Sequence, residues 1–131
     1  MSTTTGAASG ARSSGAFGLV GIAVHPSTQE LYGLTSGSSS TLYKINAATG
    51  ATTVIGANGL GFIQEGDLAF NPLNGDLYAT WTSSGRNLFK LNPATGAATI
   101  VGSMGASGDF SALAFNSAGT LYDRHRWHRS V

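Results

Sequence analysis

The feature of this 131-residue sequence that most constrains its fold is an internal repeat. The 15 residues from Leu42 to Gly56 align without gaps on Leu88 to Gly102, and nine of the 15 pairs are identical. The two copies are 46 positions apart. The same spacing relates a second segment, in which Ala23, Pro26, Leu31 and Tyr32 match Ala69, Pro72, Leu77 and Tyr78. A fixed period of this length predicts a series of similar supersecondary units.

A third copy begins at Ala114 and continues to Leu121 and Tyr122, with a slightly shorter spacing that we assign to the turn before Thr120. The repeat stops after Tyr122, where the sequence continues as DRHRWHRSV. We therefore divide the chain into a leader, residues 1–18; a first unit, 19–64; a second unit, 65–109; half of a third unit, 110–122; and a divergent basic tail, 123–131.

Each unit contains four short runs of alternating apolar residues, separated by glycine, asparagine, proline and serine. Alternation over about five residues predicts half-buried strands, and Asn74-Gly75 is typical of a tight hairpin turn. No segment has a helical period. We predict an all-β chain built from four-stranded antiparallel units, with these strands: Gly21–His25, Leu31–Thr35, Thr41–Ile45, Thr52–Ile55, Asp67–Asn71, Asp76–Trp81, Asn87–Leu91 and Ala98–Val101.

A four-stranded unit that recurs every 44–46 residues resembles a blade of a β-propeller. In particular, Asp67-Leu-Ala-Phe-Asn-Pro72, Gly75-Asp-Leu-Tyr78 and Leu88-Phe-Lys-Leu-Asn-Pro-Ala-Thr-Gly96 resemble the repeat of secreted bacterial β-propellers of the NHL and YVTN type. The resemblance covers about residues 19–122. Such families include sugar-binding and protein-binding scaffolds, cell-surface repeat proteins and a minority of calcium-dependent lactonases or lyases.

The number of units raises the question of how a ring would close. Closed propellers have about four to eight blades, whereas this sequence has two complete units and half of a third. We therefore expect a homo-oligomer, a dimer or trimer, in which residues 5–14 of one copy form an outer strand for another. The alternative is that the sequence is a fragment of a longer propeller.

The composition excludes several kinds of partner. Seven Lys and Arg residues against six Asp and Glu residues give a net charge of +1, so we expect no nucleic-acid ligand. No apolar run is long enough to span a membrane, and the absence of cysteine excludes disulfides and thiolate metal sites. The family resemblance implies a secreted or cell-surface protein, but the first residues do not have the pattern of a signal peptide, so the sequence predicts no compartment.

The first strand of each blade lines the central channel, so polar residues there are candidates for a ligand or metal site. Carboxylate and amide oxygens suit Ca²⁺, and resemblance to the calcium-dependent propellers makes Glu65, Asp67, Asn71 and Asn116 the candidates, with Asp109 in an approaching loop. The ordinary alternative, which we favour for Asn71, Asn116 and His25, is that these side chains stabilise turns.

Other candidates lie outside the channel. Trp81 is not repeated, because the first unit has Thr35 there, so we predict that Trp81 contacts a ligand such as a carbohydrate. The repeated aromatics, Tyr122 included, are assigned to the core. In the tail, His125 and His128 would suit a transition metal beside Asp123, although a replaced chain end is the simpler interpretation.

Two functions follow. The favoured one is a non-enzymatic module that binds carbohydrate or protein, or assembles with other copies, with Trp81, Asn71 and Asn116 as ligand-binding residues. The alternative is a calcium-dependent hydrolase of lactones or esters, with Asp67 or Glu65 as metal ligand or base and His25 as proton shuttle. The sequence contains none of the common nucleophile or phosphate-binding motifs.

Overall fold

The structure, a computed structural model, describes residues 2, 4–10, 15–16, 18–81, 86–105 and 109–126, with only the backbone of 109 and 124–126. These residues form ten strands and no helix. The predicted all-β fold is therefore confirmed. A membrane-spanning helix is likewise not found in this part of the chain.

The strands form two four-stranded antiparallel sheets and one two-stranded sheet. Blade 1 has β1 (Leu19–Val24), β2 (Leu31–Thr35), β3 (Thr41–Ile45) and β4 (Thr52–Ala57), paired in that order. Blade 2 repeats this arrangement with β5 (Gly66–Phe70), β6 (Leu77–Trp81), β7 (Asn87–Leu91) and β8 (Ala98–Ser103). The third sheet contains β9 (Asp109–Phe115) and β10 (Leu121–Arg126).

The two blades agree in register as well as in strand order. Leu34 pairs with Leu42 in blade 1, and Thr80 pairs with Leu88, 46 positions later, in blade 2. The pairing of the third and fourth strands is irregular at the same place in both blades, after Leu42 and after Leu88. The repeated sequence thus folds into repeated backbone geometry.

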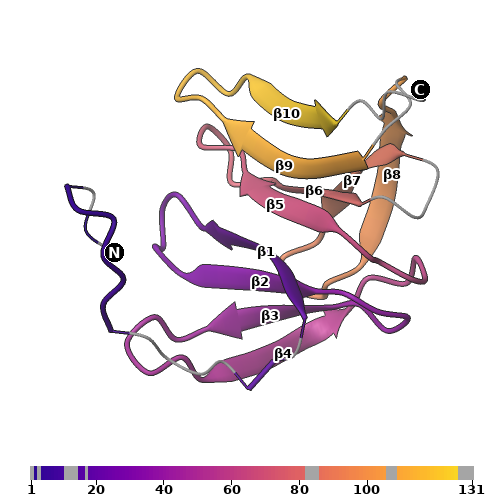
Figure 1. The fold of residues 1–131 in the computed structure, drawn as a ribbon. Helices are drawn as coiled ribbons and strands as arrows, with labels where there is room; N and C mark the ends of the chain where they lie inside the picture. Colours follow the sequence, from indigo (N-terminus) through magenta and orange to yellow (C-terminus); the bar gives the residue numbers. More distant parts are fainter. Residues whose placement is uncertain are drawn as a thin grey trace, which may run out of the picture.

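The three sheets are stacked in chain order, with the first strand of each lying next to the first strand of its neighbour (Figure 1). Strand β5 lies between β1 and β9. At the contact with β1, an added Cβ at Gly21 would come within 2.8 Å of the Asp67 Cα. The absence of a side chain at Gly21 therefore allows the first strands of the two blades to approach closely.

The core lies between blade 1 and blade 2. Because side chains alternate along a strand, each blade presents one face to the blade before it and one to the blade after it. The face of blade 1 toward blade 2, which we call its covered face, contributes Tyr32, Leu34 and Leu42, all buried. Blade 2 contributes these buried residues to the same core: Leu68, Phe70, Leu77, Ala79, Trp81, Phe89 and Leu91.

Strand boundaries differ from the prediction by one or two residues: β1 begins two residues earlier, and β4 and β8 each end two residues later. Strands β1 and β5 end before His25 and Asn71 because each of these residues stabilises the turn that follows. Strand β10 continues to Arg126, into the segment where the repeat stops, because main-chain pairing with β9 does not depend on repeated side chains. Tyr122, assigned to the core, is exposed, since no described sheet lies on its side of β10.

The described part of the leader forms no strand, and residues 4–10 lie apart from the sheets (Figure 1). Residues 4–10 contain a turn, and residues 11–14 lie outside the described residues. The predicted outer strand over 5–14 therefore stays a prediction.

Candidate functional site

His25, Asn71 and Asn116 occupy equivalent positions and stabilise equivalent turns. The Nδ1 atom of His25 accepts hydrogen bonds from the amides of Ser27 and Thr28, both 3.2 Å long. Asn71 Oδ1 accepts one from the Leu73 amide, 2.9 Å away. These contacts agree with the turn interpretation, and they leave His25 with its Nε2 atom toward Gly75.

Asn116 completes this series at the end of β9. Its Oδ1 atom accepts hydrogen bonds from the amides of Ala118 and Thr120, at 3.0 and 2.9 Å. In each of the three turns, one side-chain acceptor therefore satisfies main-chain donors that a tight turn leaves unpaired.

Asp67 lies on β5 and joins blade 2 to the third sheet. Its Oδ2 atom accepts a hydrogen bond of 2.8 Å from the Leu113 amide on β9, and its Oδ1 atom accepts one of 2.8 Å from the Leu68 amide. Both carboxylate oxygens are therefore already engaged with the main chain. A metal ligand or a base at this position would have to share these oxygens with the two amides.

Glu65 and Asn71 flank β5 at opposite ends, and six residue steps of extended chain separate them by about 20 Å. Among the described residues there is no group of three or more His, Asp or Glu side chains that could hold a metal. A calcium site in the channel that uses Glu65, Asp67, Asn71 or Asn116 stays a prediction.

Trp81 is fully buried at the end of β6. Its ring stacks on Phe89 of β7 with centroids 3.7 Å apart and an interplanar angle of 5°. The indole Nε1 atom has no hydrogen-bond partner among the described residues. This is the environment of a core residue, and it offers no surface for the predicted carbohydrate contact.

The two tail candidates lie near or beyond the end of the described residues. His125 is placed by its backbone on β10, opposite Phe110, next to an irregularity in the pairing after Asp123. His128 lies outside the described residues. A transition-metal site at His125 and His128 stays a prediction.

An ion pair repeats in both blades at the junction of the second and third strands. Lys44 Nζ lies 2.7 Å from Glu30 Oε1, and Lys90 Nζ lies 2.8 Å from Asp76 Oδ2. The hydrogen bond from Lys44 lowers the pKa of Glu30 and raises that of Lys44. Both pairs are largely exposed, so they add little to stability.

Blade 1 has a second apolar face, directed away from blade 2, which we call its open face. Three of its side chains are among the most exposed apolar residues of the chain: Ile22 at 57%, Val24 at 50% and Val54 at 63%. Their equivalents in blade 2 lie on the face that contacts blade 1, where Leu68 and Phe70 are buried and Ile100 stays 60% exposed. The open face therefore repeats the composition of a face that packs against a neighbouring sheet.

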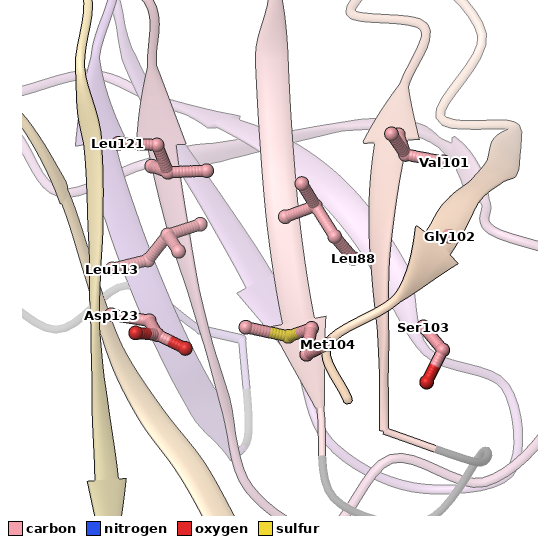
Figure 2. Close-up of a pocket in the computed structure, with 8 residues that line it drawn as sticks. All are labelled: Leu88, Val101, Gly102, Ser103, Met104, Leu113, Leu121 and Asp123. Atoms are coloured by element: carbon pink, nitrogen blue, oxygen red, sulfur yellow. The ribbon is translucent and has the colours of Figure 1, made fainter. Parts of the chain in front are cut away.

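A pocket of about 310 Å³ lies between blade 2 and β10. Figure 2 shows Leu113 and Leu121 of the third sheet on one side and Leu88 and Val101 of blade 2 on the other, with Asp123 and Met104 at one end. We call it the blade 2 pocket. Its walls are mainly apolar, and a carboxylate lies at its edge.

Sequence reasoning did not single out the blade 2 pocket, although the repeat contained the necessary signal. Leu88 and Val101 are equivalent to Leu42 and Ile55, which face blade 2 from blade 1. Asp123 occupies the position of Gly33 and Ala79, both small residues. A charged residue at a position otherwise kept small marks the place where the third sheet departs from the pattern.

Comparison with known proteins supports the fold. A chain in the crystal structure of a nidogen/laminin complex superposes with a TM-score of 0.62 and 16% sequence identity. The match covers 80% of this chain and 38% of that chain, so this chain spans well under half of that length.

This chain has a β-propeller-like fold. At 16% identity, the likeness concerns the fold alone. No family model matches the sequence, and no curated protein matches it either. The resemblance to NHL and YVTN repeats therefore stays a prediction at the level of family.

Proposed function

We propose that this protein is a non-enzymatic β-propeller module that binds protein, including further copies of itself, through the open face of blade 1. The observation that carries the proposal is the exposure of Ile22, Val24 and Val54 together on one sheet face. Exposed apolar patches of this kind are typical of protein-interaction surfaces.

The repeat supports a sheet as the partner. In blade 2, the equivalent face packs against the covered face of blade 1, where Leu34 and Leu42 are completely buried. A partner with a similar apolar sheet face would bury Ile22 and Val24, the equivalents of Leu68 and Phe70, in the same way. The solved structure that this chain resembles is itself described as a complex between two proteins, nidogen and laminin.

The proposal favours protein over carbohydrate as the ligand. The exposed residues of the open face are aliphatic, whereas carbohydrate sites generally use an exposed aromatic ring for stacking, and Trp81 is buried. Oligomerisation through this face is the first form of binding to be tested, because it needs no other protein.

The test compares two lysine substitutions on opposite faces of blade 1. Ile22→Lys introduces a charge on the open face, at a position whose blade 2 equivalent, Leu68, is buried, whereas Thr53→Lys introduces it on the opposite face at an exposed position of β4. We expect the average mass of the unmodified chain, measured by sedimentation, to increase with concentration, and Ile22→Lys to reduce this increase while Thr53→Lys preserves it. A mass that stays monomeric at every concentration, or equal effects of the two variants, would refute self-association.

A further inference from the structure

The blade 2 pocket lies beside the edge of β10 that has no partner strand among the described residues. Among the described residues, β10 pairs only with β9, whereas β2 and β6 each pair with a third strand. The edge of β10 and the apolar side chains of Leu88 and Val101 therefore form one groove between the third sheet and blade 2 (Figure 2).

Blade 1 has an equivalent surface, and there blade 2 covers it. Leu42, the equivalent of Leu88, is completely buried, and Ile55, the equivalent of Val101, packs against the core. The outer half of the cover comes from β7 and β8, through Phe89, Leu91 and Ala98. Two paired strands, β7 and β8, therefore cover the outer half of this surface in blade 1.

We infer that the groove binds a β-hairpin of a partner protein, which adds a third strand to β10 and carries a basic residue opposite Asp123. Addition of a strand to a free sheet edge combines main-chain hydrogen bonds with pockets for alternate side chains. This site lies on the far side of blade 2 from the open face of blade 1, so it is separate from the proposed function.

The register of blade 2 specifies the side chains of the partner. In β6, Ala79 pairs with Phe89 and Leu77 pairs with Leu91. Asp123 and Leu121 hold the positions of Ala79 and Leu77 in β10. The residue opposite Asp123 should therefore be followed, two positions later, by an aliphatic residue opposite Leu121.

Charge favours lysine or arginine opposite Asp123. The Asp123 side chain is exposed at the edge of the pocket and takes part in neither of the two ion pairs found among the described side chains. Opposite charges that face each other across two strands stabilise the pairing, whereas an aromatic residue in that position would meet an unneutralised carboxylate.

The experiment measures the binding of a peptide that copies residues 87–103 of this chain, which form β7, its turn and β8. A second peptide carries arginine in place of Phe89. We expect the full-length protein to bind the second peptide about threefold more tightly than the first, as one cross-strand ion pair would produce. Asp123→Ala, which restores the residue type of Ala79, should remove this preference without preventing binding.

Two further variants locate the site. Val101→Lys places a charge in the pocket and should abolish the binding of both peptides, while Ile100→Lys, on the opposite face of β8 and similarly exposed, should leave it unchanged. The inference is overturned if neither peptide binds at millimolar concentration, if the two lysine variants behave alike, or if the preference for arginine survives Asp123→Ala. Ile22→Lys, on the open face of blade 1, should not affect peptide binding, so this result and the test of self-association are separable.

Discussion

The two contacts between neighbouring sheets have the same backbone arrangement but are held in different ways. Between blade 1 and blade 2, Leu34 is completely buried among apolar side chains. At the equivalent position in blade 2, Thr80 donates a hydrogen bond of 3.2 Å from Oγ1 to the Phe110 carbonyl of β9. Asp67, where blade 1 has Gly21, adds a second polar link to β9.

This difference shows which part of the contact the two junctions share. One feature is common to both contacts: Tyr32 lies against Phe70 with ring centroids 5.1 Å apart, and the equivalent Tyr78 lies against Phe115 at 5.5 Å. Both contacts therefore have the tyrosine–phenylalanine pair. The residues around this pair are buried apolar side chains in the first contact and form hydrogen bonds to the main chain of β9 in the second. The second contact leaves the blade 2 pocket beside it.

The largest effect is expected at the apolar contact. Leu34→Ala removes a completely buried side chain and should lower the free energy of unfolding by about 2–5 kcal/mol. Urea denaturation measures the change. Leu73→Ala, in an exposed turn, is the control and should change stability by less than about 0.5 kcal/mol. Equal effects would show that Leu34 does not lie in a core.

A slightly smaller effect is expected where β1 and β5 approach each other. In Gly21→Ala, the added Cβ would lie 2.8 Å from the Asp67 Cα and the Leu68 amide nitrogen, so the first strands must separate. We expect a loss of about 1–3 kcal/mol in the free energy of unfolding. Gly102→Ala adds the same methyl group where nothing lies within 4 Å, and it should be close to neutral. A neutral Gly21→Ala would contradict the close approach.

A substitution at the polar contact between blade 2 and the third sheet should have a smaller effect on stability, confined to the third sheet. Asp67→Ala removes the acceptor of the Leu113 amide and should lower the free energy of unfolding by about 1 kcal/mol, since water can reach this half-buried position. Amide hydrogen exchange should accelerate at Leu113 and its neighbours in β9 while β2 and β3 are unaffected. A uniform increase over all strands would show that Asp67 does not act specifically at the third sheet.

The smallest effect concerns the exposed pair of Glu30 and Lys44. Because the hydrogen bond from Lys44 lowers the pKa of Glu30, the carboxylate contributes stability above its ordinary pKa of 4.5, and this contribution disappears as the pH falls through the lowered value. Glu30→Gln should therefore be slightly less stable than the parent at pH 7 and equally stable in acid. Urea denaturation at both pH values tests this, and a difference independent of pH would contradict it.

The sequence predicted the fold well because the repeat shows where each strand lies and how many strands form a unit. Alternating residues and the paired copies from Leu42 and from Leu88 define the strands, and the structure has all eight predicted strands with only small shifts at their ends. The earlier ends of β1 and β5 arise at residues such as His25, whose side chain accepts main-chain hydrogen bonds and so ends the strand. Local chemistry of this kind is hard to distinguish from strand continuation in sequence alone.

The candidate sites were less predictable because they depend on which face a side chain takes. Trp81 was selected since it is not repeated, but β6 directs it toward blade 1, where it stacks on Phe89. Asp67 was selected as a metal ligand, but its partner is a main-chain amide of β9, far away in sequence. The repeat identifies the residues that line the blade 2 pocket, but the packing of two sheets is needed to show that they enclose a cavity.

The central claim is that consecutive repeats are neighbouring sheets stacked through equivalent contacts. Nuclear Overhauser effects between aromatic rings test it most directly, because Tyr32–Phe70 and Tyr78–Phe115 join different sheets at equivalent positions. We predict cross-peaks for both pairs in the folded protein. The absence of both, or cross-peaks that join Tyr32 to Phe115, would contradict the claim.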